Sequence, residues 1–345
     1  MCARLPRLVL PGLLLGLTLG LGLLPSTRAA EPAASIEAQS RALQRASAAV
    51  VGLRTVAVED ARSAATLGRL REGSGVVIGP GELVLTIGYL ILEAEHVQLV
   101  TDDAREVPAR LVGYDIATGF GLVQPLAPLR IEPAPLGTGA SLATGDALMV
   151  VSGGEDGAVG VAQLVSRRGF SGYWEYHVEG ALFTAPARPD HSGAGLFNAR
   201  GELVGIGSLL VRDAGGPGAA PLSGNMFVPI ELLPPILSEL RSRGSSAQSR
   251  RAWMGINCIE ADGVVRVVRV NSDSPAEVAR LEPGDRIVRI DGTEVRALEV
   301  LWKTLWAGGA SEREVTLDIV RRGQAQTVKL QSVDRMKTLR SAQGI

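Results

Sequence analysis

The stretch HSGAGLFNARGELVGI, residues 191–206, contains a serine whose sequence neighbours fit either a catalytic residue or a structural one. Ser192 stands among small residues, and the apolar pair LF leads from it to NARG, a hairpin signal, and then to a second apolar run. Such a serine is either a nucleophile with partners elsewhere in the chain or a small residue that suits a sharp turn. If Ser192 is a nucleophile, the rest of the sequence must supply the residues that activate it.

Residues 49–230 consist mainly of short apolar runs separated by glycine-containing turns. GPG between GVVI and ELVLT is a second hairpin signal of the same kind as NARG. Many short strands with closely spaced turns predict a barrel or a sandwich. ELLPPILSEL, residues 231–240, predicts a short helix, and the polar, Ser-rich residues 241–251 predict a linker.

Residues 252–332 predict a second domain of mixed α and β structure. Strands are expected at AWMGINCIE and VVRVVRV, a short helix with Pro275 in its first turn, and a closing hairpin at EVTLDIVRRGQAQTVKLQ. A longer helix over LEVLWKTLWAGG places four apolar side chains on one face: Leu298, Leu301, Trp302 and Leu305. Residues 333–345 are expected to be a frayed tail.

The start of the chain predicts export. Residues 1–29 combine a basic start, an apolar run and a small-residue site, as a secretory signal does, and residues 30–46 form an N-terminal segment with a helical lead-in. The alternative is an uncleaved membrane anchor, but Pro11 and four glycines make the run a poor permanent span. We therefore expect a periplasmic or secreted protein.

Composition excludes several classes of function. The chain has 345 residues and is 46% hydrophobic, which suffices for two domains, and no basic block points to nucleic acid. Cys258 remains after signal cleavage, so no internal disulfide is expected, and its setting predicts a small core residue. The histidines stand far apart among few other ligands, so neither a metal nor a cofactor is expected: His96, His177 and His191.

In four places the chain resembles the HtrA (Deg) family. The matching stretches are GSGVVIGPGELVLT, HSGAGLFNARGELVGI, GNMFVPI, and AWMGI together with SPAEVARLEPGDRIVRIDGTEV. The resemblance implies a mainly β protein, with a trypsin-like double β-barrel over residues 47–240 followed by a PDZ (α+β) domain over residues 252–332. It also implies a homotrimer to which the N-terminal segment contributes.

The resemblance also places the catalytic positions, and two of the three have changed. Hydrolysis by serine needs a hydroxyl, an imidazole that takes its proton, and a carboxylate that orients the imidazole. The serine position is Ser192, but the histidine position holds Tyr89 and the aspartate position holds Gly119, with Asp115 four residues earlier.

The predicted oxyanion hole is altered as well. It would use the backbone N–H groups of Ser192 and of the residue two positions before it, which is glycine in the family and Asp190 here. This aspartate brings a negative charge to the place where an oxyanion would form.

No other base is a strong candidate. His191 is adjacent to Ser192 and should project away from it, and the lysines lie in or beyond the second domain: Lys303, Lys329 and Lys337. A tyrosine, with an ordinary pKa near 10, is a poor base at neutral pH. We expect Tyr89 to fill the space of the missing imidazole, which would leave Ser192 vestigial.

The second domain keeps the features that the family uses to bind peptides. PDZ domains add an extended peptide to a sheet edge and capture its terminal carboxylate with backbone N–H groups. The matching residues are Trp253, Met254, Gly255 and Ile256, with Leu301 and Leu305 lining an apolar pocket. The alternative is that these residues only build the core. Arg280 replaces a helix-ending glycine of the family, which should affect the turn more than the groove.

Three functions follow from these features. The first is an HtrA-like pseudoprotease whose PDZ domain binds protein C-termini or unfolded polypeptides, as an adaptor, scaffold or regulator in protein quality control, including of active family members. The second is an active serine endopeptidase that uses Ser192 with a non-standard base. The third is a structural envelope protein that uses neither site.

Overall fold

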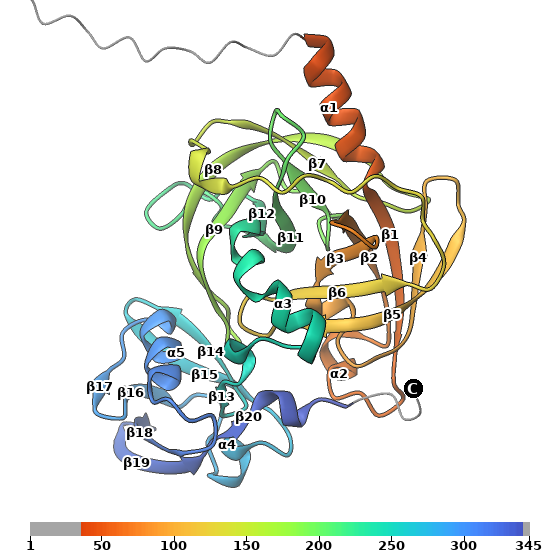
Figure 1. Ribbon diagram of the computed structural model, residues 1–345. Coiled ribbons are helices and arrows are strands. Elements are labelled where there is room, and N and C mark those ends of the chain that lie inside the picture. Colours follow the sequence, from red (N-terminus) through yellow and green to blue (C-terminus); the bar gives the residue numbers. More distant parts are fainter. Residues whose placement is uncertain (1–35, 341–345) are drawn as a thin grey trace, which may run out of the picture. The chain divides into compact units, whose positions relative to one another are not determined.

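The computed structural model describes residues 36–340, and the secretory signal predicted at residues 1–29 lies outside them (Figure 1). After α1 (Ile36–Ala48), six strands close into a barrel in the order β1-β2-β3-β6-β5-β4. Their bounds are β1 Val50–Ala57, β2 Leu70–Ile78, β3 Leu83–Ile87, β4 Ala94–Val100, β5 Glu106–Tyr114 and β6 Phe120–Pro125. The predicted GPG hairpin joins β2 to β3, and α2 (Ala64–Leu67) lies between β1 and β2.

A second closed barrel follows in the order β10-β11-β12-β9-β8-β7. Its strands are β7 Ala147–Val151, β8 Val159–Ser171, β9 His177–Ala185, β10 Gly195–Phe197, β11 Leu203–Val211 and β12 Gly224–Pro229. The predicted NARG turn joins β10 to β11. Phenylalanines contribute the largest fully buried side chains of the two barrels: Phe120, Phe183, Phe197 and Phe227. The prediction of a double β-barrel is confirmed.

The helix predicted at residues 231–240 is displaced toward the C-terminus. A 3-10 turn, η3 (Ile230–Leu232), comes first, and α3 runs over Pro234–Arg243. Proline suits the first helical turn, and Gly244, with φ of 77°, ends the helix in the left-handed conformation. The predicted linker is folded against the first barrel here, because the hydroxyls of Ser246 and Ser249 each donate to Asp115 at 2.5 Å.

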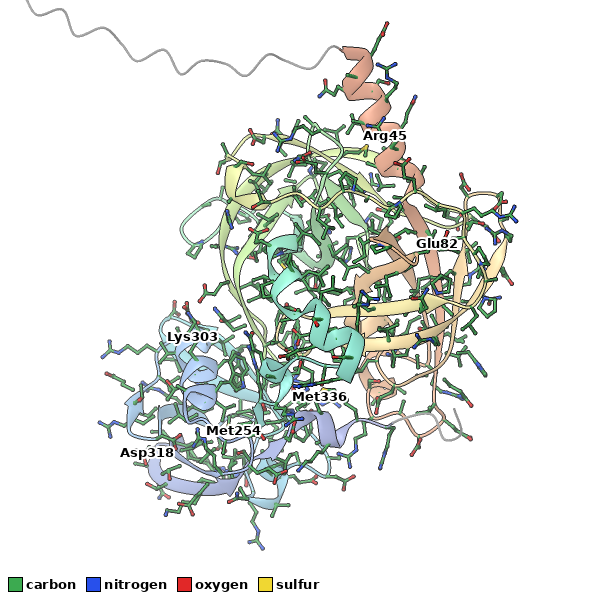
Figure 2. The ribbon with its side chains drawn as sticks, in the orientation of Figure 1. Arg45, Glu82, Met254, Lys303, Asp318 and Met336 are labelled. Atoms are coloured by element: carbon green, nitrogen blue, oxygen red, sulfur yellow. The ribbon has the colours of Figure 1, made fainter. Side chains whose placement is uncertain are left out.

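The C-terminal domain is a sheet in the order β14-β15-β16-β18-β19, with β17 paired to β16. The strands are β14 Ile256–Ala261, β15 Val264–Val270, β16 Arg286–Ile290, β17 Thr293–Glu294, β18 Glu314–Arg321 and β19 Gln324–Gln331. Helices α4 (Pro275–Val278) and α5 (Leu298–Ala307) complete it. Figure 2 shows Met254 and Lys303 among the side chains of this domain. The chain after α4 turns at Arg280, whose φ of 56° lies in the region that favours glycine.

The core of this domain contains the apolar face predicted for α5. Leu301, Trp302 and Leu305 are fully buried, and Leu298 is nearly so. Cys258 is a buried free thiol, and burial raises its pKa. β14 lies at one edge of the sheet order, which is the position that an added strand requires.

The residues after 332 are more ordered than the sequence indicated. Val333–Asp334 forms β20, which pairs with β13 (Ala252–Trp253), and η5 (Arg335–Thr338) follows. The Asp334 carboxylate accepts a hydrogen bond from the Met336 N–H at 3.0 Å and so caps this turn. The expectation of a frayed tail was therefore wrong for these residues. None of the described helices is both long enough and apolar enough to cross a membrane.

Candidate functional site

Ser192 lies in a cleft to which both barrels contribute. Residues 52–54 and 72–74 line it from β1 and β2, and Ser152 to Asp156 together with Pro189, Asp190 and Ser192 line it from the second barrel. The Ser74 N–H donates to the Ser192 carbonyl at 2.8 Å and ties the serine turn to β2. Gly193, with φ of 73°, makes this approach feasible, because a Cβ there would lie 2.0 Å from the Ser74 carbonyl oxygen.

Tyr89 occupies the position opposite the Ser192 hydroxyl. It lies on η1 (Gly88–Leu90), and its hydroxyl is hydrogen-bonded to the Ser192 Oγ at 2.7 Å and to the Ser208 carbonyl, which can only accept, at 3.0 Å. Burial raises the pKa of Tyr89 to about 12, against the opposing effect of the Ser192 bond. The phenol is therefore protonated near pH 7 and is not available as a base to take the proton of Ser192.

No carboxylate stands at the predicted aspartate position. Gly119 has φ of 85°, and a Cβ there would lie 3.2 Å from the Tyr176 hydroxyl, which donates to the Thr118 carbonyl at 2.7 Å. Asp115 is fully buried but has a different set of partners. Its carboxylate accepts from the Thr118 N–H and hydroxyl at 2.8 and 2.6 Å, besides the two linker serines. Asp115 therefore holds the turn and the linker in place.

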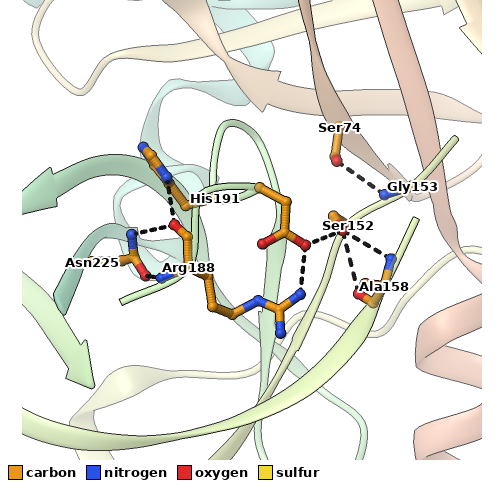
Figure 3. A network of polar contacts seen from close by, with 8 residues as sticks. Ser74, Ser152, Gly153, Ala158, Arg188, His191 and Asn225 are labelled. Carbon is orange, nitrogen blue, oxygen red and sulfur yellow. Dashed lines mark hydrogen bonds and ion pairs between the residues drawn. The ribbon is translucent and has the colours of Figure 1, made fainter. Parts of the chain in front are cut away.

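The imidazoles of the described residues make their hydrogen bonds elsewhere. His191 Nδ1 lies 2.9 Å from the Arg188 carbonyl, and burial lowers the pKa of His191 although this bond opposes the effect (Figure 3). His177 Nδ1 lies 2.8 Å from the Ser171 hydroxyl, and His96 is exposed on β4. Within residues 36–340, no histidine hydrogen-bonds to the Ser192 hydroxyl.

Asp190 adds a fixed negative charge to the Ser192 cleft. Its carboxylate accepts from the Ser152 hydroxyl at 2.6 Å and from Arg188 Nη2 at 2.5 Å, in the network of Figure 3. Burial favours the neutral acid, but the bonds from Arg188 and Ser152 outweigh it and lower the pKa of Asp190. The carboxylate is thus ionised at neutral pH. Its ion pair with Arg188 offsets part of its negative charge, and the remainder disfavours the oxyanion that amide hydrolysis would create nearby.

The second candidate site is the set of N–H groups at the start of β14. The N–H groups of Met254, Gly255 and Ile256 donate to the Glu175 carboxylate at 3.1, 2.8 and 3.1 Å. Gly255, with φ of 87°, gives this turn its shape. Of the predicted peptide-binding residues, Met254, Gly255 and Ile256 thus direct their backbone N–H groups at one carboxylate, that of Glu175. Leu301 and Leu305 lie in the core, and Trp253 pairs in β13.

Glu175 was missed from the sequence. It is only 3% exposed, and burial raises its pKa to about 7, against the opposing charge of Arg335 and the three N–H groups. The sequence signal that could have identified Glu175 is its position between Trp174 and Tyr176. A charged residue within an aromatic, buried run needs a specific partner.

This buried acid predicts a pH dependence of stability. The folded pKa lies above the ordinary value of 4.5, so the stabilising effect of protonation is complete below about pH 4.5 and is lost as pH rises through about 7. The charged and titratable groups that act on Glu175 are Arg335 and Cys258. Thermal unfolding should be measured for the wild type and Glu175→Gln at pH 5 and pH 8. Between these pH values the free energy of unfolding of the wild type should fall by up to about 3 kcal/mol more than that of the variant. If wild type and variant differ in stability by the same amount at both pH values, the raised pKa of Glu175 is contradicted.

Folding also brings together three groups with metal-ligand chemistry, which the sequence did not indicate. The ligand atoms of His177, Glu179 and Glu299 lie within 4.8 Å of one another. The Lys303 ammonium lies 2.5 Å from both carboxylates and already neutralises part of their charge. The trio is thus an ion-paired contact between β9 and α5.

Comparison with known families agrees with this architecture. Residues 73–206 match the model of the trypsin-like peptidase domain, and residues 252–331 match that of the PDZ domain. These two domain matches, with the relatives and structures below, support the HtrA (Deg) family for this chain.

Curated relatives are similar at low identity. A probable periplasmic serine endoprotease, DegP-like, of Hahella chejuensis is 27% identical over 278 residues, covering 75% of this chain and 56% of that protein. The putative serine protease HhoA of Synechocystis is 27% identical over 294 residues, covering 76% of this chain and 70% of that protein. This chain therefore spans little more than half the length of the first relative.

Solved structures show the same fold. The HtrA-type protease AlgW with decapeptide aligns with a TM-score of 0.54 at 21% identity, over 86% of this chain and 98% of that one. The serine endoprotease from Yersinia pestis aligns with a TM-score of 0.52 at 21% identity, over 86% and 97%. At this identity the likeness supports the shared fold.

Proposed function

We propose that this protein is an extracytoplasmic HtrA-like pseudoprotease that binds polypeptides through its PDZ domain. The observation that carries the proposal is the 2.7 Å hydrogen bond between a protonated Tyr89 and the Ser192 hydroxyl, where the family's chemistry needs an imidazole. The ionised Asp190 beside the serine adds a second obstacle. Residual catalysis after loss of a triad member depends on the oxyanion hole, which this charge opposes.

The binding role rests on the edge strand β14 and the N–H groups before it. Three N–H groups that converge on one carboxylate offer what the terminal carboxylate of a peptide needs. The related AlgW structures carry a decapeptide or a tripeptide. We therefore propose protein C-termini or unfolded polypeptides as ligands, and a role as adaptor, scaffold or regulator in protein quality control.

Location and assembly complete the proposal. The DegP-like relatives are named as periplasmic, which supports a periplasmic or secreted location for this chain. A homotrimer, and association with active family members, remain proposals drawn from the family resemblance.

The proposal can be tested with a cleavage assay and a peptide-binding assay on the mature protein. Unfolded casein should stay intact during an incubation in which an active HtrA protease degrades it. Labelled peptides with a free C-terminal carboxylate should bind, and their C-terminal amides should bind at least about tenfold more weakly, because a charged acceptor is lost. Casein cleavage that Ser192→Ala abolishes would favour the endopeptidase alternative. Absence of both cleavage and binding would favour a structural envelope protein.

A further inference from the structure

We propose that residues 172–175 act as a built-in ligand of the PDZ groove, so that an external C-terminus binds only by displacing them. The inference rests on the proposed peptide-binding function and adds its regulation. Residues 172–175, GYWE, connect β8 to β9 in the second barrel and are called the GYWE segment below.

The GYWE segment bonds to the free edge of β14. The Cys258 N–H donates to the Tyr173 carbonyl at 2.6 Å, and the Ile256 N–H donates to the Glu175 carboxylate at 3.1 Å. N–H groups two residues apart on a strand point to the same edge. Residue 173 is bonded to residue 258 and residue 175 to residue 256. The segment therefore runs antiparallel to β14, as an added strand can.

The opposite wall of the groove also holds the GYWE segment. The indole N–H of Trp302, on α5, donates to the Gly172 carbonyl at 3.1 Å. The segment is thus hydrogen-bonded to β14 on one side and to α5 on the other. Trp302 is fully buried, so this contact is shielded from water. These are the strand and the helix between which the sequence placed the peptide site.

Glu175 takes the place of a terminal carboxylate. It accepts all three N–H groups of Met254, Gly255 and Ile256, and both of its oxygens accept from Met254. A terminal carboxylate of a partner would need the same donors. Two carboxylates would repel each other there, so occupation by Glu175 and by a partner is mutually exclusive.

The aromatic residues favour this conformation of the GYWE segment. The Trp174 ring stacks on Tyr176 with centroids 5.6 Å apart, and Tyr173 packs edge-on against Trp174 at 4.8 Å. A ligand that is tethered and ordered competes at a high effective concentration, of millimolar order. Weakening its carboxylate contact should therefore raise the affinity for free peptides.

The test compares peptide affinity among full-length mature variants. The probe is a fluorescein-labelled decapeptide of residues 166–175, SRRGFSGYWE, with a free C-terminus. Glu175→Ala and Glu175→Gln should bind it about tenfold or more tightly than the wild type, because the first variant removes both oxygens that accept the three buried N–H groups and the second replaces one of them with a donor. The matched control is Glu179→Ala, which loses an exposed ion pair to Lys303 and should bind like the wild type.

Each outcome decides the proposal. Tighter binding by the two Glu175 variants alone supports a built-in ligand. Equal affinity in wild type and variants overturns it but leaves the peptide-binding function standing, whereas no binding by any variant overturns both. If Glu175→Ala does not fold, amide hydrogen exchange of the wild type and Glu175→Gln provides the answer. Ile256 and Cys258 should exchange faster in the variant, and unchanged exchange would overturn the proposal.

Discussion

The mature protein is expected to hydrolyse peptide amides on the order of 10⁶-fold more slowly than an HtrA protease with an intact triad, because loss of the triad histidine alone costs that much. The reason is local: Tyr89, which is hydrogen-bonded to Ser192, is protonated and cannot act as a base, and Asp190 is ionised beside the serine. Hydrolysis of a fluorogenic peptide should be measured for both proteins under the same conditions.

The matched control for this rate is Ser192→Ala. In an intact triad this substitution removes almost all activity, but here we expect the rate to change less than about twofold, because the serine has no base. A hundredfold loss of rate in the variant would show that Ser192 is a working nucleophile. Tyr89→His alone should not restore the rate, since Gly119 offers no carboxylate to orient the new imidazole.

Asp115→Ala is expected to lower the free energy of unfolding by about 3 kcal/mol or more, because it leaves buried hydrogen-bond donors without an acceptor. These donors are the Thr118 N–H and the hydroxyls of Thr118, Ser246 and Ser249. Urea unfolding followed by circular dichroism measures the change.

The control for Asp115 is Asp102→Ala, which removes an exposed carboxylate from the same barrel. Its unfolding midpoint should stay close to that of the wild type. Equal midpoints for the two variants would contradict the role given to Asp115. A loss of peptidase activity specific to Asp115→Ala, without a loss of stability, would instead return this carboxylate to the catalytic candidates.

The fold could be predicted because its signals are local. Alternation of apolar residues, the GPG and NARG turns and the apolar face of α5 each depend on neighbouring residues, and the structure confirms the strands and helix that they predicted. The start of α3 was misplaced by a few residues, because Pro234 determines where the helix begins. The order of residues 333–338 was missed, because it depends on pairing with β13.

The site could be predicted only in part, because its decisive contacts join distant residues. The match to a family motif pointed to Tyr89 as the residue facing Ser192, and the structure places the two hydroxyls 2.7 Å apart. Nothing local indicated that Glu175 would meet the N–H groups before β14, about 80 residues later. The role of Asp115 was equally hidden, since two of its donors come from the linker.

Labelling with a fluorophosphonate probe shows whether Ser192 is an activated nucleophile. Folded mature protein, Ser192→Ala and an active HtrA protease would be treated together and analysed by intact mass. We expect complete labelling of the active protease and no mass change in the other two proteins. A probe adduct on the wild type that Ser192→Ala lacks would contradict this expectation, and would mean that a base reaches the serine.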